Sequence, residues 1–409
     1  INGGKKYPYS SIIIASDVGI DKGILIEELD LSNEGVSLEV SSKREYLYGK
    51  LGANFLGYIG LINRSEFDKL KHYGYQINDF VGRDGIEKNY DEYLRGKHGG
   101  KQIEVDHMGR EADVLGYKEP VPGKNIGLTI DLELQKFCEK ELEGKQGTII
   151  VMDPNTGKIF VMANSPTYDP GIFVDEERSS ERTETLKDAT YPMLNRAIAG
   201  VYPPGSIFKV IVAIAGLEEG AININTPFFC NGEIVLGKRV FHCWRKSGHG
   251  EQILAEAIKN SCNVFFWRLG LKLGVDNISE YAKRFGIGAK TGIDLPGEKQ
   301  GLLPTREWKR KTSGESWYLG ETMNYSVGQG YLLCSPIQIV RVISVFANKG
   351  FLVRPYLVDK VDEVVVNTPK RINIGITLED IQEVREGLKK VVNDKHGTGM
   401  KAKNNDIVV

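Results

Sequence analysis

The chain has 409 residues, with 53 Lys and Arg against 54 Asp and Glu, so its formal net charge is −1. This balance argues against a nucleic-acid-binding protein, because such proteins neutralise phosphates with a basic surplus. Apolar residues make up 41% and charged residues 26% of the chain, which excludes a disordered or collagen-like protein. The length predicts two to three domains.

No run of about 18 apolar residues occurs, so the sequence predicts no helix that spans a membrane. The chain begins at Ile1 and shows none of the segments of a signal peptide. We therefore expect that any signal or N-terminal membrane anchor is absent from this chain.

Residues 1–122 are rich in Gly, Lys, Tyr and Asp and predict a modest α+β domain. Alternating apolar and polar residues predict strands at 35–40 and 102–106, and a short helix is expected at 64–72. The segment Pro120-Val121-Pro122-Gly123 disfavours both helix and strand, so we place a domain boundary after residue 122.

Residues 123–409 predict a second α+β domain, in which helices pack on an antiparallel sheet. Two strands are expected at 148–152 and 158–162, because Asp153-Pro154-Asn155-Thr156-Gly157 between them is typical of a hairpin turn. Apolar stretches predict helices at 132–142, 208–217, 253–258, 264–273, 337–347 and 381–392.

The most informative segment surrounds Ser206. Pro203-Pro204-Gly205 predicts a tight turn, and the apolar run that follows predicts a buried helix with Lys209 on the same face as Ser206. A serine hydroxyl needs a base to take its proton, and a lysine whose pKa is lowered by burial can be that base. The alternative is that Ser206 caps the helix and Lys209 reaches solvent.

A second element, Ser261-Cys262-Asn263, lies between two predicted helices. A Ser-x-x-Lys, a Ser-x-Asn and a Lys-Thr-Gly element together are the signature of penicillin-binding proteins and class A β-lactamases. In that pattern Ser261 would relay a proton between Lys209 and the leaving amine, and Asn263 would hold Lys209 and the substrate. A polar helix cap explains the triplet alone equally well.

The third element has a match by letter in Lys290-Thr291-Gly292, which we reject. Pro296 follows closely and would end a strand there, whereas the element has to lie on an edge strand beside the nucleophile.

Together these motifs make the chain resemble the class B penicillin-binding proteins, the monofunctional peptidoglycan D,D-transpeptidases, and most of all the elongation-type penicillin-binding protein 2. The resemblance also rests on segments 82–96, 285–298 and 326–338, and it covers the whole chain. It implies a pedestal, or dimerisation, domain over residues 1–122 and a penicillin-binding transpeptidase domain over residues 123–409.

In this family the Lys-Thr-Gly strand follows a segment such as Gly397-Thr398-Gly399, and this chain stops at Val409. The resemblance therefore implies a transpeptidase domain that is truncated before that strand. Family members use the strand to bind the substrate carboxylate and to complete the oxyanion hole.

Three cysteines and a histidine gather around the second element, namely Cys230, Cys243, His249 and Cys262. Three thiols and one imidazole suit a tetrahedral structural zinc site, and His242 is an alternative nitrogen ligand. A disulfide with one free cysteine and the burial of three ordinary small residues are the open alternatives. The resemblance favours Zn²⁺, because some family members carry a zinc site at the matching places, with carboxylates where Cys230 and Cys243 stand here.

The resemblance implies an enzyme that cross-links peptidoglycan. Ser206 would attack the penultimate D-Ala carbonyl of a stem peptide, and β-lactams would acylate the same serine. The implied partner is a membrane glycosyltransferase of the elongation complex, and the implied location is the periplasmic or extracytoplasmic face of the cell membrane. A β-lactamase or β-lactam sensor, and a scaffold of the cell-elongation machinery, are the competing hypotheses.

Because the third element is missing, we expect the 409-residue chain to show little transpeptidase turnover and poor acylation by penicillin. Incubation with a fluorescent penicillin, followed by denaturing electrophoresis, measures this. Strong labelling of the 409-residue chain would contradict the expectation.

Overall fold

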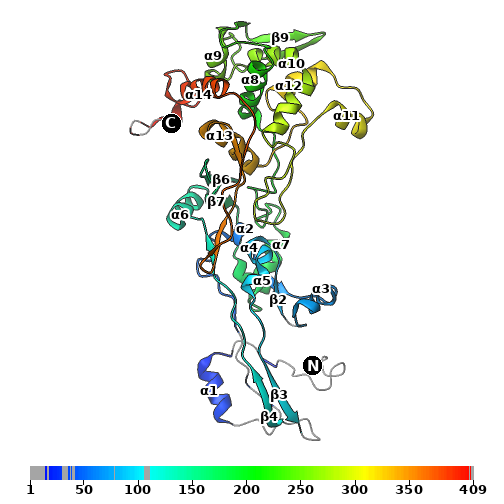
Figure 1. Cartoon of the computed structure of the whole chain (residues 1–409), viewed down its shortest axis with the longest axis vertical. Helices are drawn as coiled ribbons and strands as arrows, with labels where there is room; N and C mark the ends of the chain where they lie inside the picture. The colour runs from blue at the N-terminus through cyan, green and yellow to red at the C-terminus, as the bar shows by residue number, and fades with distance from the viewer. Residues whose placement is uncertain are drawn as a thin grey trace. The chain divides into compact units, whose positions relative to one another are not determined.

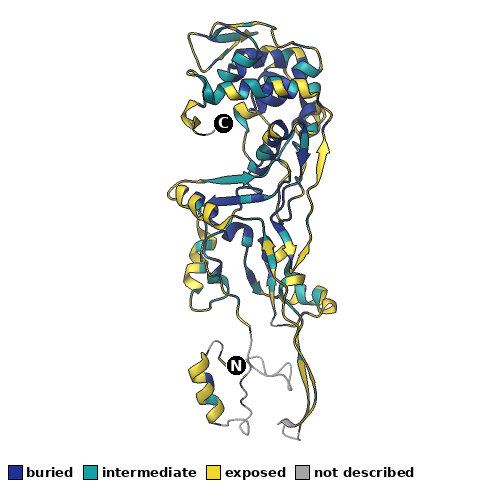
Figure 2. Cartoon of the chain, turned by 60° about the vertical axis from the view of Figure 1, so that its left-hand side comes forward, coloured by how far each residue is buried: buried dark blue, intermediate teal, exposed yellow. Residues whose placement is uncertain are grey.

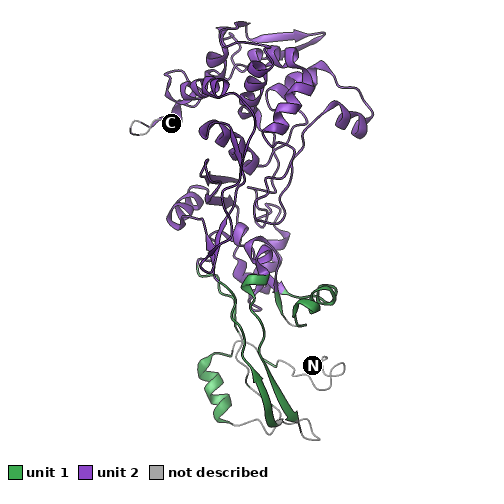
Figure 3. Ribbon diagram, viewed as in Figure 1, with its two compact units in different colours: residues 1–47, 61–80, 92–124 green, residues 48–60, 81–91, 125–409 purple. Residues whose placement is uncertain are grey.

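The computed structural model describes residues 14–15, 18–29, 36, 38, 42–77, 79–105, 111–404 and 406. The chain forms two units, which Figure 3 colours separately. The first comprises residues 1–47, 61–80 and 92–124, and the second comprises residues 48–60, 81–91 and 125–409. Two segments that precede residue 122 thus belong to the second unit.

Apolar burial explains why these two segments belong there. Phe55 from the first segment and Ile86 from the second are 3% and 4% exposed. Both lie in one apolar cluster with residues of the later chain, including Ile159 and Leu357, which are fully buried. Burial of apolar surface is the main favourable contribution to folding, so these contacts define the unit more strongly than sequence order does.

The first unit contains the predicted strand at 102–106, which the structure places in β3 (Gly100–Val105). This strand pairs with the antiparallel β4 (Glu111–Lys118). The predicted helix at 64–72 is found as α3 (Arg64–Leu70), followed by a 3₁₀ turn. Asn63 and Glu66 form a reciprocal capping box that fixes where α3 begins. The predicted strand at 35–40 lies largely outside the described residues.

The remaining elements before residue 125 are short. They are α1 (Ile20–Glu28), α2 (Ala53–Leu56), β1 (Ile59–Leu61), the 3₁₀ helix Lys71–Tyr73, β2 (Phe80–Gly82), α4 (Gly85–Asn89) and α5 (Asp91–Leu94).

The strands of the second unit pair in antiparallel fashion, as expected, but as several small sheets among the described residues. The predicted hairpin is confirmed, because β6 and β7 pair from Gly147 opposite Ser165 onward. The strands are β5 (Ile126–Leu128), β6 (Gly147–Met152), β7 (Ile159–Ser165), β8 (Phe228–Cys230), β9 (Glu233–Leu236), β10 (Arg239–His242), β11 (Gly250–Gln252), β12 (Phe351–Val353), β13 (Val358–Val361), β14 (Val364–Val365) and β15 (Arg371–Asn373).

Helix α10 runs to Arg284 but is kinked at Gly274, which has a non-helical φ of +75° directly after the predicted end at residue 273. All six predicted helices of this unit are present. Figure 1 shows most of them gathered around α8. The helices are α6 (Leu132–Glu141), α7 (Ser179–Lys187), α8 (Lys209–Glu218), α9 (Leu254–Lys259), α10 (Asn263–Arg284), α11 (Arg306–Ser313), α12 (Leu319–Ser326), α13 (Pro336–Ala347) and α14 (Leu378–Asn393). Short 3₁₀ helices occur at Pro170–Phe173, Gly205–Phe208 and Met400–Ala402.

Helix α8 is the buried centre of this arrangement, and Figure 2 shows buried residues, in dark blue, among the helices of this unit as well as in its strands. Every residue from Lys209 to Gly216 is buried, so the helix is enclosed on all sides. It packs against α10 and α14, whose apolar faces close the core. Among the described residues, no helix is both long and apolar enough to cross a membrane.

Candidate active site and metal centre

The structure brings the four predicted catalytic side chains together. Ser206 is exposed in the 3₁₀ helix that leads into α8, and the chain reaches it through the predicted Pro-Pro-Gly turn. Ser261 and Asn263 lie more than fifty residues later, at the junction of α9 and α10. The Ser261 hydroxyl donates to Ser206 Oγ over 2.9 Å, which joins the two parts of the site.

Lys209 is the buried member of the group, with 3% of its surface exposed. Its Nζ donates to Ser261 O at 2.9 Å, to Ser261 Oγ at 3.0 Å and to Asn263 Oδ1 at 2.7 Å. Each N–H of the ammonium form thus has an acceptor. Burial among apolar residues disfavours the charged form and lowers the pKa of Lys209 to about 8, and the nearby thiols of Cys262 and Cys243 oppose that shift.

The turn at Ser261 has a geometry that the sequence did not reveal. Ser261 has a φ of +48°, in the left-handed region that glycine usually occupies at a helix end. Its N–H donates to Ile258 O at 3.0 Å, and the N–H of Cys262 donates to Ala257 O at 2.9 Å. These two bonds form a Schellman motif, which terminates α9 and points the Ser261 hydroxyl toward Lys209 and Ser206.

Lys290-Thr291-Gly292 is not in a strand, which confirms its rejection as the third catalytic element. The Glu298 carboxylate accepts hydrogen bonds from the N–H and the hydroxyl of Thr291, both at 2.6 Å, and from the N–H of Gly292 at 3.2 Å. This segment is therefore a closed turn. Thr398, in the segment expected to precede the true element, donates its hydroxyl to Lys259 O at 3.1 Å.

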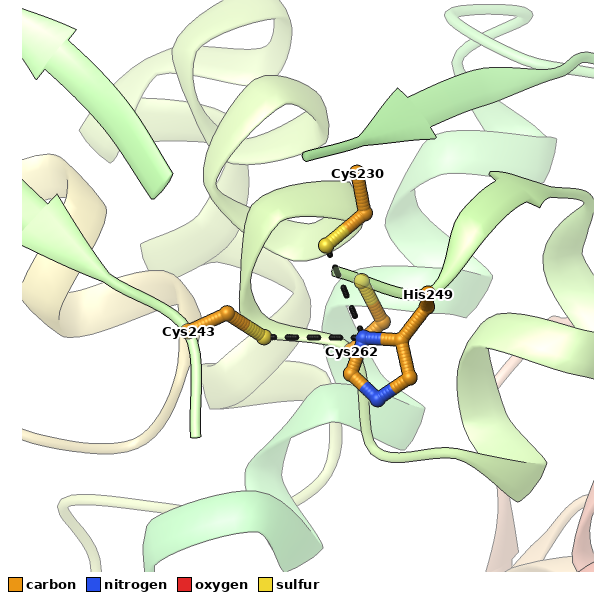
Figure 4. Close-up of side chains that lie close together, drawn as sticks. All are labelled: Cys230, Cys243, His249 and Cys262. Carbon is orange, nitrogen blue, oxygen red and sulfur yellow. Dashed lines mark hydrogen bonds between the residues drawn. The ribbon is translucent and has the colours of Figure 1, made fainter. Parts of the chain in front are cut away.

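The predicted metal ligands also converge, as Figure 4 shows. Cys230 ends β8, Cys243 follows β10, His249 precedes β11 and Cys262 caps α10. Their ligand atoms all lie within 4.8 Å of one another. His249 Nδ1 faces the sulfurs, at 3.5 Å from Cys230 Sγ and 3.7 Å from Cys243 Sγ.

Backbone contacts explain how these separate segments meet. Strands β8 and β11 pair so that Cys230 lies opposite Gly250, and the His249 N–H donates to Cys230 O at 3.1 Å. Gly248 has a φ of +76°, and a Cβ there would lie 2.2 Å from Cys230 O, so the approach requires glycine.

The thiols of the cluster influence one another strongly. A hydrogen bond from Cys262 lowers the pKa of the Cys243 thiol, and burial lowers the pKa of His249. All five cysteines fall within the described ranges, and all are free thiols. Cys138 and Cys334 are buried outside the cluster.

His242, the alternative nitrogen ligand, lies outside this cluster. Its side chain is 65% exposed and its Nδ1 is 3.2 Å from the Glu233 carboxylate. The residue is the last of strand β10, whereas Cys243 beside it is buried.

Trp244 is a neighbour of both centres that the sequence reasoning overlooked. Its ring centroid is 5.1 Å from that of His249, and its Nε1–H donates to Asn260 O at 3.0 Å. Its position directly after the candidate ligand Cys243 was the feature of the sequence that could have identified it.

The comparisons with known proteins agree with this geometry. The family model described as "Penicillin binding protein transpeptidase domain" matches residues 147–408, and the model described as "Penicillin-binding Protein dimerisation domain" matches residues 2–128. The first match covers more than half of the chain. The chain therefore belongs to the penicillin-binding protein transpeptidase family, which confirms the resemblance inferred from its motifs.

Individual relatives are similar over most of this chain. "Peptidoglycan D,D-transpeptidase MrdA" of Haemophilus influenzae is 34% identical over 90% of this chain and 58% of its own length. A Pseudomonas aeruginosa PBP2 structure in complex with WCK 5153 is 34% identical, with a TM-score of 0.78, over 89% of this chain and 77% of the other. A Helicobacter pylori complex of PBP2 and MreC gives a TM-score of 0.81 at 32% identity, over 89% of this chain and 66% of the other. The chain spans a little over half the length of the curated relatives it matches.

The buried amine of Lys209 should titrate near pH 8, so that it is mostly protonated at pH 7 and mostly neutral at pH 9. The ¹³Cε resonances of labelled lysines, followed over this range, measure the titration. The resonance that shifts near pH 8 should disappear in Lys209→Met and persist in Lys389→Met, which removes a lysine from the exposed side of α14. A chain in which no lysine resonance titrates below about pH 9.5 would contradict the lowered pKa, since an unperturbed lysine titrates near 10.4.

Proposed function

We propose that this protein is a peptidoglycan D,D-transpeptidase that works through a serine acyl-enzyme. The observation that carries the proposal is the hydrogen-bonded chain from Ser206 Oγ to Ser261 Oγ to Lys209 Nζ, with neighbouring distances of 2.9 and 3.0 Å. It places a hydroxyl nucleophile one proton relay away from an amine whose pKa is lowered to about 8. Membership of the transpeptidase family, and relatives named peptidoglycan D,D-transpeptidase, support it.

The proposed reaction begins when Ser206 Oγ attacks the penultimate D-Ala carbonyl of a stem peptide. Its proton passes to Ser261 Oγ, whose own proton passes to neutral Lys209 Nζ. The terminal D-Ala then leaves as an amine after taking a proton back along the same path. An amine from a neighbouring strand attacks the ester carbonyl, forms the cross-link and regenerates the Ser206 hydroxyl.

Asn263 has a double part in this proposal. Its Oδ1 accepts from Lys209 at 2.7 Å, which fixes the amine, and its amide nitrogen remains available to the substrate backbone. A β-lactam would acylate Ser206 by the same steps, except that the leaving nitrogen stays attached through the opened ring.

The proposed partners follow from the same family membership. They are a stem peptide that ends in D-Ala-D-Ala, β-lactam antibiotics, and a membrane glycosyltransferase of the cell-elongation complex. Solved structures similar to this chain include a PBP2–MreC complex and a peptidoglycan synthase complex, which supports assembly with other cell-wall proteins. The corresponding location is the extracytoplasmic face of the cell membrane.

We also propose that Cys230, Cys243, His249 and Cys262 hold a structural Zn²⁺. The donor set fits the metal, because a tetrahedral zinc with Zn–S bonds of about 2.3 Å and Zn–N bonds of about 2.0 Å separates its ligand atoms by roughly 3.5–3.8 Å. The two sulfur–Nδ1 distances of 3.5 and 3.7 Å agree with this value. A bound zinc would neutralise the thiolates and hold Cys262 in place. Cys262 lies between Ser261 and Asn263, so a metal that fixes Cys262 would also fix the positions of these two residues of the proton relay.

The acylation proposal is tested on the protein expressed from its natural gene. A fluorescent penicillin should label the wild type, and intact-mass and peptide analysis should place one adduct on Ser206. Ser206→Ala should carry no adduct, and Lys209→Met should acylate about 100-fold more slowly or worse, because general-base catalysis is worth roughly 10²–10⁴-fold. Ser180→Ala, on the exposed helix α7, is the matched control and should label normally. An adduct that survives in Ser206→Ala would refute the assignment.

The zinc proposal is tested by elemental analysis of protein purified without chelators. We expect about one zinc per chain in the wild type and in Cys138→Ser, which removes a buried cysteine outside the cluster. Cys262→Ser should lose most of the metal, because it removes one of the four ligands. Wild-type protein that contains no metal, and takes up none on dialysis against zinc, would end the proposal.

A further inference from the structure

The turn that presents Ser206 is held by a segment more than a hundred residues later in the chain. The N–H of Gly205 donates to Gly328 O at 2.9 Å. Tyr202 and Cys334 then exchange two backbone hydrogen bonds, each of 2.9 Å. Residues 328–334, which we call the clamp segment, therefore hold residues 202–205, just before the nucleophile, by hydrogen bonds at Tyr202 and at Gly205.

Gly328 approaches this turn so closely that no other residue fits. A Cβ on Gly328 would lie 2.1 Å from Gly205 O and 2.8 Å from the Cβ of Phe208. Gly328 also has a φ of +74°, which disfavours any L-residue with a side chain. A side chain at this position would have to displace the backbone on either side of Ser206.

The clamp segment is itself firmly supported, so it can act as a fixed reference. Before it, the ring of Tyr325 stacks on that of Phe208 at 5.2 Å, and each residue is 1% exposed. On its other edge, Leu333 and Leu302 exchange backbone hydrogen bonds of 2.8 and 3.0 Å. The nucleophile turn, in contrast, is short and exposed at Ser206, and two prolines precede it.

We propose that Gly328 is a positioning residue for the nucleophile, a role that rests on the proposed acyl-transfer function. Its carbonyl holds the Gly205 N–H, and its missing side chain lets the clamp segment lie against the turn. The distance between Ser206 Oγ and Ser261 Oγ is thereby kept within hydrogen-bonding range. Gly328 acts through the backbone and contacts no reacting atom.

The first test measures acylation by a β-lactam over a range of concentrations, which separates the acylation rate constant from the affinity of the non-covalent complex. The variant Gly328→Ala is made in the protein expressed from its natural gene. It should lower the acylation rate constant about 100-fold, because a misplacement of the Ser206 hydroxyl by about 1 Å can cost that much. The affinity should change less than about threefold, since the substrate-binding groups stay in place.

Gly330→Ala is the matched control. Gly330 has a similar φ of +78°, but a Cβ there would meet only Asn324 Cβ, at an ordinary 3.5 Å. It therefore adds the same backbone strain without the collision, and its rate constant should stay within about threefold of wild type. Equal rate constants in the two variants would refute the positioning role. A wild type that is not acylated would instead refute the proposed function.

The second test requires no catalysis, and its first measurement is made on the wild type and so requires no variant. Amide hydrogen exchange of the wild-type 409-residue chain should show the Gly205 N–H protected to a similar degree as the N–H groups of Tyr202 and Cys334. In Gly328→Ala, protection should fall at Gly205 and persist at Leu302 and Leu333. A Gly205 amide that exchanges freely in the wild type would overturn the proposal.

Discussion

A lysine amine that is 3% exposed needs an acceptor for every N–H it carries when protonated, because an unpaired buried charge is very costly. Lys209 finds all three acceptors on two residues, Ser261 and Asn263, which belong to a different part of the chain. Removing one partner from a buried charged group typically costs about 3–5 kcal/mol. The hydrogen bonds of this one amine therefore stabilise the packing of α8 against the start of α10. They also hold the two catalytic motifs together.

The same amine shows how burial serves chemistry. Were Lys209 exposed, it would stay protonated at neutral pH and could not accept a proton. Burial lowers its pKa to about 8, so a useful fraction is neutral near physiological pH. The nearby thiols of Cys262 and Cys243 oppose the shift, and the acceptors hold Nζ beside Ser261 Oγ. The reactivity of the amine thus depends on its burial, and its position depends on its hydrogen bonds.

Much of this site could be predicted from sequence, because its candidate catalytic residues lie in short motifs. Ser206, Lys209, Ser261 and Asn263 were named from their motifs, and the long apolar helices were found by their periodicity. The four candidate metal ligands were named because they gather around the second motif, and the family resemblance favoured zinc over the alternatives. Helices α7 and α11 were missed because both are mostly polar. The small strands β8 to β11 are too short to show alternation, and yet Cys230 ends β8, Cys243 directly follows β10 and His249 directly precedes β11.

Other features depend on contacts that no local pattern encodes. His242 and His249 were both credible nitrogen ligands, and strand pairing separates them: the register of β8 with β11 brings His249 to Cys230, whereas that of β9 with β10 places His242 opposite Glu233. The assignment of residues 48–60 and 81–91 to the second unit likewise follows from apolar contacts over long sequence separations. The left-handed φ of Ser261 is hidden as well, since glycine would be the expected residue at that helix end.

Ser206 and Ser261 lie on two short turns, and each hydroxyl also depends on contacts from outside its own turn to keep its position. Each turn is fixed by a separate support. The turn at Ser206 lies against Gly328, where a side chain is excluded, and the turn at Ser261 is followed by Cys262, whose sulfur faces the other ligands of the cluster. A left-handed serine costs about 1–2 kcal/mol relative to an unstrained residue, so the surrounding contacts have to offset it. Gly328 lies against the turn of Ser206, and Cys262 directly follows Ser261, so the 2.9 Å hydrogen bond between the two serines depends on how distant segments pack.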